Sequence, residues 1–236
     1  EELHDFDEVI DVRSPGEFAE DHVPGAINLP VLTDAERERV GTLYKQVSSF
    51  EAKKVGAALV SRNIAQYLEG YLADKPKSYR PLVYCWRGGS RSGAMTHILQ
   101  KIGFGAMQLD GGYKAYRRHV VAELSCLPAR LSYRVVCGPT GSGKSRLLQV
   151  LESEGAQVLD LEELAAHRGS LLGALPDRDQ PTQKSFESGI WFALDRFDPM
   201  RPVFVESESK KIGVLRVPDA LIEAMIVSPG DDVLLA

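Results

Sequence analysis

A glycine-rich run in the second half of the chain has the pattern of a phosphate-binding loop. Residues 138–145 read GPTGSGKS and match G-x-x-x-x-G-K-[ST]. The β-branched pair Val135-Val136 precedes the run, and Leu147, Leu148 and Leu151 follow it at helical spacing. A strand, a glycine-rich turn and a helix in this order direct backbone N–H groups and a helix N-terminus at an anion. We therefore expect this loop to bind a di- or triphosphate, and not merely to join a strand to a helix.

The residue types in this loop suggest distinct roles. Lys144 would reach a terminal phosphate, and the Ser145 hydroxyl would coordinate Mg²⁺. A further acid would help to hold the metal through water, either Glu206 or Asp160, each of which follows an apolar run. Neither acid lies in the pattern of four apolar residues followed by Asp, so the sequence leaves both open. The predicted phosphate-binding residues are Gly138, Thr140, Gly141, Ser142, Gly143, Lys144 and Ser145.

A second reactive group is predicted at Cys85, which follows the apolar run Pro81–Tyr84. In an open parallel sheet, ligands bind at the carboxyl ends of strands and at the helix starts beside them. Backbone amides, a helix N-terminus and the cations Arg87 and Arg91 would lower the pKa of this thiol and yield a reactive thiolate. A cysteine that packs as a small hydrophobe is the alternative. The predicted catalytic residues are Cys85, Arg87 and Arg91, and the predicted anion loop contains Trp86, Gly88, Gly89 and Ser90.

The composition is that of a globular protein without a membrane span. Of 236 residues, 44% are hydrophobic and 26% are charged, and no apolar run approaches the ~20 residues that a span needs. The three cysteines are odd in number and show no paired spacing, which predicts a reducing cytoplasm. Cys126 and Cys137 lack the surroundings of Cys85, and we expect both to be structural. We also expect a monomer.

The net charge of −5 is unevenly distributed. Residues 1–130 contain 17 basic and 17 acidic side chains, whereas residues 131–236 contain 11 and 16. This balance does not indicate a nucleic-acid-binding protein, although composition cannot show a local basic patch. Lys210, Lys211 and Arg216 form a small basic cluster. A solvated face is its simplest interpretation, and contact with phosphate or tRNA is the alternative.

Short apolar runs alternate with helical patterns along both halves. From Thr33 to about Leu72 the pattern is helical, and Thr33 with Glu36 is placed as an N-terminal cap. The helical stripe from Phe186 to Leu194 is more typical of a core than of a platform for bases. Alternating strands and helices predict α/β domains with parallel sheets, doubly wound in the first half. Strands are expected at residues 9–12, 26–29, 106–109, 157–160 and 203–206. Two further strands are expected before the glycine-rich turns, one from Pro81 with Cys85 at its C-terminal end and one at Val135-Val136.

Three motifs in the first half resemble those of rhodanese domains. Residues 11–18 (DVRSPGEF) and 22–30 (HVPGAINLP) resemble the opening motifs, and residues 109–113 (LDGGY) resemble the closing one. Cys85 falls where that family keeps its sulfur-carrying cysteine. A rhodanese domain followed by a phosphate loop is similar to the tRNA 2-selenouridine synthase family. The supporting segments are 85–89 (CWRGG), 112–115 (GYKA), 161–165 (LEELA) and 167–170 (HRGS).

This resemblance implies a domain order. We expect a rhodanese-like domain carrying Cys85 over residues 1–122, a linker over 123–131 and a P-loop NTPase-like α/β domain over 132–236. Members of the resembled family usually continue further, so we expect the last domain to be incomplete at its C-terminus.

The resemblance also implies a reaction. The enzyme would be a transferase that replaces sulfur by selenium in the wobble 2-thiouridine of certain tRNAs. Geranyl diphosphate would first alkylate the sulfur, and selenophosphate would then supply selenium through an S-selanylcysteine at Cys85. The phosphate loop would suit a diphosphate leaving group as well as a nucleotide such as ATP or GTP.

Three other functions remain open at this stage. Cys85 and Arg91 have the Cys-x5-Arg spacing of cysteine phosphatases, in which the cysteine attacks phosphorus and the arginine binds the phosphate oxygens. A rhodanese-type sulfurtransferase fused to a nucleotide-binding domain is a second alternative. A third is a P-loop kinase with a regulatory rhodanese module.

Overall fold

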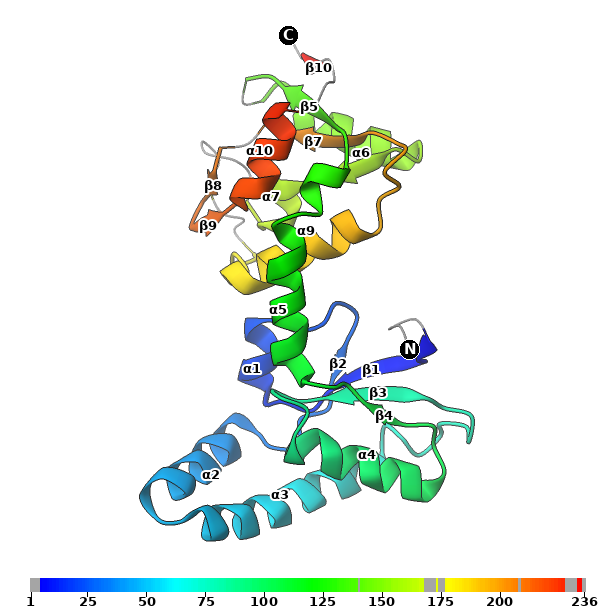
Figure 1. Ribbon diagram of the computed structural model, residues 1–236, viewed down its shortest axis with the longest axis vertical. Helices are drawn as coiled ribbons and strands as arrows, with labels where there is room; N and C mark the ends of the chain where they lie inside the picture. Colours follow the sequence, from blue (N-terminus) through cyan, green and yellow to red (C-terminus); the bar gives the residue numbers. More distant parts are fainter. Residues whose placement is uncertain are drawn as a thin grey trace. The chain divides into compact units, whose positions relative to one another are not determined.

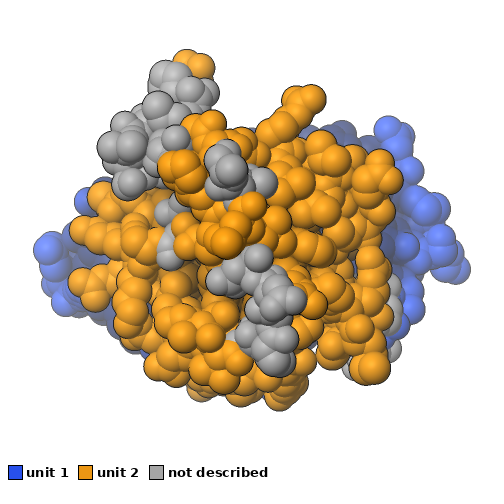
Figure 2. Space-filling view, turned by 90° about the horizontal axis from the view of Figure 1, so that it is seen from above, with its two compact units in different colours: residues 1–117 blue, residues 118–236 orange. Residues whose placement is uncertain are grey.

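The computed structural model describes residues 5–139, 141–167, 173, 177–207, 209–227 and 233–234. The chain divides into two compact units, residues 1–117 and 118–236, which Figure 2 colours separately. Helix α5 (Gly112–Leu124) begins in the first unit and ends in the second. Within the described ranges, none of the helices is both long enough and apolar enough to span a membrane.

The first unit is built on a four-stranded parallel sheet of order β2-β1-β3-β4. Figure 1 shows helices on both faces of this sheet, with α3 and α4 together on one of them. Its core joins the central strands to helices α3 and α4 through side chains such as Ile10, Val83, Ile64 and Met95. The strands are β1 (Glu8–Asp11), β2 (Ile27–Asn28), β3 (Pro81–Tyr84) and β4 (Met107–Gln108). The helices before α5 are α1 (Pro15–Glu20), α2 (Asp34–Gln46), α3 (Ser49–Glu69) and α4 (Ser90–Ile102).

The long helical pattern after Thr33 forms two helices instead of one. Thr33 and Glu36 make the expected capping box at the start of α2. The chain then breaks at Val47-Ser48, where the Ser48 hydroxyl accepts a hydrogen bond from the Glu51 amide at 3.0 Å and caps α3. A serine that satisfies a free helical amide starts a new helix more readily than it continues an old one.

The second unit contains a second parallel four-stranded sheet, of order β10-β5-β7-β6. The predicted fold class of two α/β units, each with a parallel sheet, is confirmed. The strands are β5 (Tyr133–Cys137), β6 (Gln157–Leu159), β7 (Val203–Glu206) and β10 (Val233–Leu234), with an antiparallel hairpin of β8 (Lys211–Ile212) and β9 (Leu215–Arg216). The helices are η2 (Pro128–Arg130), α6 (Lys144–Ser153), α7 (Leu161–Leu164), α9 (Gln183–Asp195) and α10 (Asp219–Val227). Thr140 and residues 168–170, which the sequence singled out, lie outside the described residues.

A buried ion pair at the end of β1 ties the first unit together. The Arg13 guanidinium donates to both carboxylate oxygens of Asp11 at 2.6–3.0 Å, and both side chains are at most 1% exposed. The guanidinium also donates to the Asp21 carbonyl and lies 4.0 Å from the centre of the Tyr113 ring. The Tyr113 hydroxyl donates to the Asp21 carboxylate at 2.8 Å. Residues from the first and last motifs of this unit therefore meet in one polar network.

We predict that Asp11→Asn destabilises the first unit strongly. The substitution keeps the shape of the side chain but leaves the buried Arg13 charge without its counter-charge, which costs about 3–5 kcal/mol when a buried pair is broken. The exposed pair Glu51–Lys54 offers a control, because Glu51→Gln should change the free energy of unfolding by less than about 1 kcal/mol. Urea denaturation followed by circular dichroism would test this, and equal effects of the two substitutions would contradict it.

Candidate functional site

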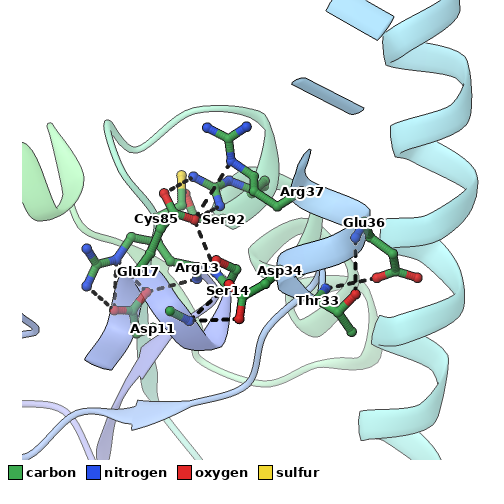
Figure 3. Close-up of polar contacts among 12 residues, drawn as sticks. Asp11, Arg13, Ser14, Glu17, Thr33, Asp34, Glu36, Arg37, Cys85 and Ser92 are labelled. Carbon is green, nitrogen blue, oxygen red and sulfur yellow. Dashed lines mark hydrogen bonds and ion pairs between the residues drawn. The ribbon is translucent and has the colours of Figure 1, made fainter. Parts of the chain in front are cut away.

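Cys85 follows β3 directly, and its sulfur receives several hydrogen bonds. The thiol is buried, with 4% of the residue exposed. The Ser92 hydroxyl donates to Sγ at 3.1 Å, as Figure 3 shows. The backbone N–H groups of Arg87, Gly89 and Ser92 donate to the same atom. These donors come from the loop and the first turn of α4, so the short loop wraps its amides around the sulfur.

The balance of these effects favours a thiolate at Cys85. Burial raises the pKa of the thiol, because a charged sulfur loses hydration. The hydrogen bonds from the Ser92 hydroxyl and from the three backbone amides outweigh burial, so the pKa lies below its usual value. A lowered pKa gives the buried sulfur the anionic character that a nucleophile or a chalcogen carrier needs.

The loop is held from behind by the start of α5. The amides of Tyr113 and Lys114 donate to the carbonyls of Cys85 and Trp86, each at 2.9 Å. Gly112 has a φ of +56°, and a Cβ there would overlap the Cys85 carbonyl. Only glycine fits this position, because both the backbone angle and the close approach exclude a side chain. The motif LDGGY therefore forms the support of the Cys85 loop.

The side chains of the two predicted arginines lie in different settings. Arg91 Nη1 donates to Glu17 Oε2 at 2.6 Å, and Nη2 donates to Glu17 Oε1 at 3.3 Å. Arg87 is exposed, and it is its backbone amide that reaches the sulfur. The hydrogen bonds that lower the Cys85 pKa therefore come from neutral groups. A charge contribution from Arg87 or Arg91 stays a prediction.

The other predicted residues of the anion loop lie around the same turn. Gly88 has a φ of +68° and accepts a hydrogen bond from the Gln108 side chain on its carbonyl. The Trp86 ring is tilted against Tyr113, with ring centres 5.3 Å apart. Ser90 is the first residue of α4.

The phosphate loop joins β5 to α6 as predicted, with both described central glycines in the left-handed region. Gly141 and Gly143 have φ values of +85° and +90°. The ammonium of Lys144 donates to the carbonyls of Gly138 and Pro139 at 2.9 and 3.3 Å. The lysine thus folds back over its own loop, from which position it can transfer to a phosphate oxygen.

Two acids lie at the carboxyl ends of β7 and β6, which belong to the same parallel sheet as the strand before the phosphate loop. Glu206 ends β7 and pairs in register with Val136 of β5, while Asp160 follows β6 and caps α7. Burial, followed by the charge of Asp160, raises the pKa of Glu206 to about 8. Burial also raises the pKa of Asp160 above its usual range.

These acids and Ser145 offer oxygen donors of the kind that Mg²⁺ prefers. Glu206 Oε1 accepts a hydrogen bond from the Glu162 amide at 2.7 Å, whereas its buried Oε2 has no hydrogen-bond partner among the described residues. The Ser145 hydroxyl donates to Glu162 Oε2 at 3.3 Å. An orphaned carboxylate oxygen and a nearby hydroxyl fit a magnesium site completed by phosphate and water. No group of three or more His, Cys, Asp or Glu in the described ranges is arranged to hold a metal by itself.

Several residues of these sites carried no signal in the sequence. Glu17 lies 74 positions before Arg91, and Asp21 lies 92 positions before Tyr113, so no local pattern joins them. Glu162 lies in the segment 161–165, which in the sequence supports only the family resemblance. Ser92 directly follows Arg91 in the chain, but its hydrogen bond to the sulfur of Cys85 depends on the fold. Cys126 is exposed, and Cys137 is partly buried at the end of β5.

Comparison with protein families matches both halves of the chain. Residues 1–119 match the rhodanese-like domain, and residues 131–231 match the tRNA 2-selenouridine synthase AAA domain. The chain belongs to the tRNA 2-selenouridine synthase family. The predicted resemblance is therefore confirmed for both domains and for their order.

Two known synthases and one solved structure are similar to this chain. A tRNA 2-selenouridine synthase of Nitrosomonas europaea is 39% identical over 90% of this chain and 56% of its own length. One of Shewanella denitrificans is 39% identical over 92% of this chain and 59% of its own length. A solved N-terminal domain from Clostridium difficile 630 is 41% identical, covers 48% of this chain and 88% of that one, and has a TM-score of 0.43. The chain thus spans less than two thirds of the length of these two synthases.

We predict that Ser92→Ala raises the pKa of Cys85 more than Arg91→Gln does. Ser92→Ala removes a direct hydrogen bond to the sulfur, whereas the charge of Arg91 is already matched by Glu17. Because alkylation by iodoacetamide follows the thiolate fraction, its rate curve should move to higher pH in the Ser92 variant. A larger shift for Arg91→Gln would instead show that cationic charge dominates the thiol environment.

Proposed function

We propose that this protein replaces sulfur by selenium in the wobble 2-thiouridine of tRNA. The proposal rests on the family and on the two anion sites, Cys85 and the phosphate loop. The relatives carry the name tRNA 2-selenouridine synthase. We propose tRNA, a selenium donor and a prenyl diphosphate as its substrates, and a cytoplasmic enzyme.

The observation that carries the proposal is the environment of the Cys85 sulfur. A buried thiol with a lowered pKa and four neutral donors is suited to hold a single negative charge. The Cys85 thiolate would attack the selenium of selenophosphate, so that a sulfur–selenium bond forms, the selenium–phosphorus bond breaks with its electron pair on phosphorus, and phosphite leaves. Cys85 would then hold the selenium as an S-selanylcysteine anion. The amides that stabilise the thiolate would stabilise the terminal selenium in the same way. Arg87 would attract the donor, whereas Arg91 would do so only when it is released from Glu17. Residues 86–90 would form the anion cradle.

The phosphate loop would serve the prenyl donor. Residues 138–145 supply amides and Lys144 to the diphosphate of geranyl diphosphate. The sulfur of 2-thiouridine attacks the first carbon of the geranyl group, the carbon–oxygen bond breaks, and diphosphate leaves. If bound, Mg²⁺ would be held by Ser145, and through water by Glu206 or Asp160, and would supply charge to stabilise the departing diphosphate.

Alkylation makes the second step chemically reasonable. A thiocarbonyl sulfur is a poor leaving group, whereas an S-geranyl group leaves as a thiolate. Selenium is soft and nucleophilic, so it attacks the carbon that carries the S-geranyl group, a carbon–selenium bond forms, and geranylthiol departs. An external thiol would then reduce the sulfur–selenium bond, which frees Cys85 and leaves the selenium on the uridine. The two sites thus have separate tasks, because the phosphate loop has no thiol and the Cys85 loop has no lysine for a diphosphate.

We predict that Cys85→Ser folds normally but stops selenium transfer, because a serine hydroxyl at this position is neither anionic nor a chalcogen carrier. Turnover to 2-selenouridine should fall by at least about 100-fold, on the order of the loss when a covalent nucleophile is removed. The exposed Cys126→Ser is the matched control and should retain turnover. Mass analysis of digested tRNA after incubation with selenophosphate and geranyl diphosphate would decide this. Full turnover in the Cys85 variant would remove Cys85 as the carrier.

We predict that Lys144→Ala blocks the first step and that Cys85→Ala blocks the second. The Lys144 variant should yield no S-geranyl tRNA, whereas the Cys85 variant should accumulate it. Lys101→Ala, an exposed lysine on α4, is the control for loss of one positive charge. Chromatography of digested tRNA would separate the species. Normal geranylation by the Lys144 variant would point to ATP or GTP in the phosphate loop.

A further inference from the structure

The guanidinium of Arg91 is held by a carboxylate on a different helix. Its two nitrogens lie 2.6 and 3.3 Å from the two carboxylate oxygens of Glu17 on α1, and both side chains are mostly buried. Burial raises the pKa of Glu17, but the hydrogen bond and charge of Arg91 lower it below its usual range. Glu17 is therefore ionised at neutral pH and cancels the charge of Arg91.

Glu17 is itself held firmly in this place. Its Oε2 accepts a hydrogen bond from the Ser14 amide at 3.2 Å, as part of the capping box of α1. The Asp34 carboxylate accepts from the neighbouring Gly16 amide at 3.0 Å, which fixes the same turn. Arg37 on α2 approaches Glu17 Oε2 only to 3.8 Å and is nearly half exposed. Arg91 is thus the principal partner of Glu17, and Arg37 the weaker one.

Because Arg91 is paired with Glu17, the groups that donate hydrogen bonds to the Cys85 sulfur are neutral. The sulfur receives hydrogen bonds from backbone amides and from the Ser92 hydroxyl. Neutral donors suit one negative charge close to the sulfur. A phosphate group carries more charge at neutral pH, and proteins commonly bind it through the paired N–H groups of an arginine. Arg91, at the Cys-x5-Arg spacing, is the residue that would have to turn towards such an oxyanion.

We propose that Glu17 is a specificity-determining residue that withholds Arg91 from the Cys85 loop. With Arg91 withheld, the loop stabilises a monoanionic sulfur or selenium atom beside Cys85 and binds a phosphate group only weakly, including the phosphate group of a selenium donor. If Arg91 turned towards a phosphate, its close contacts with Glu17 would break. The partly buried Glu17 carboxylate would then keep only Arg37, 3.8 Å away, as a counter-charge. The identity of the anion that the Cys85 loop binds rests on the proposed function. The pairing of Arg91 with Glu17, which keeps Arg91 away from the loop, does not rest on it.

The test uses inorganic phosphate as the probe and the alkylation of Cys85 as the readout. Phosphate bound at the loop slows the reaction of Cys85 with iodoacetamide, and peptide mass spectrometry measures each cysteine separately. Phosphate bound at the phosphate loop does not affect this local readout. The exposed Cys126 serves as an internal control, because its rate should not depend on phosphate. The informative variant is Glu17→Gln, whose amide oxygen can still accept from the Ser14 amide and keep the helix cap.

In Glu17→Gln, the phosphate concentration that half-protects Cys85 should fall about tenfold, the ratio expected for one charge-assisted hydrogen bond. The double variant Glu17→Gln/Arg91→Gln should return to the wild-type value, because the gain requires the arginine. Glu38→Gln removes an exposed carboxylate from α2 and should change nothing. Unchanged protection in Glu17→Gln, or a gain that persists in the double variant, would overturn the proposal.

Two further measurements keep the outcome interpretable. A circular dichroism melt shows whether Glu17→Gln is folded. If Glu17→Gln does not fold, Glu17→Asp takes its place, because it withdraws the carboxylate by one methylene group. We expect the same fall in the phosphate concentration that half-protects Cys85. The formation of 2-selenouridine is assayed separately, so an enzyme without selenium transfer can still show phosphate discrimination, and the two proposals can fail independently.

Discussion

A buried sulfur anion must be surrounded by hydrogen-bond donors, and the first unit is arranged to meet this requirement. Water cannot reach Cys85 freely, so the amides of its own loop and the Ser92 hydroxyl replace hydration. A loop short enough to do this needs support from outside itself. The start of α5 supplies it by donating to the carbonyls on the far side of the loop, and Gly112 makes that approach sterically possible.

The polar network beneath the loop extends this support into the core. Arg13 joins the end of β1 to the Asp21 carbonyl and to the ring of Tyr113, whose own amide holds the Cys85 carbonyl. The buried Asp11–Arg13 pair is therefore linked to the reactive sulfur through a single residue. Buried charges are costly unless they are paired, and here the pairing also fixes the position of the α5 N-terminus.

Both units place an anion-binding loop at the carboxyl end of a parallel strand, but the two loops differ in the positive charge that their side chains supply. In each sheet the strands are parallel, so reactive loops gather at the carboxyl ends of the strands. The phosphate loop adds Lys144 to its amides, which suits a diphosphate. In the Cys85 loop, the charge of Arg91 is already neutralised by Glu17, which suits an anion with a single charge. This difference in electrostatics supports a division of labour between the two sites.

The sequence by itself determined the features that depend on local geometry. The glycines of residues 138–145, the Thr33 cap and the strand before Cys85 each act within a few residues, so short patterns reveal them. The break at Val47-Ser48 was missed, because apolar spacing alone does not show where one helix ends. Only the tertiary structure decided the partners of Arg91, Tyr113 and Ser145. These partners lie on other elements, and a charge or a hydroxyl in the sequence does not specify which distant group will neutralise it.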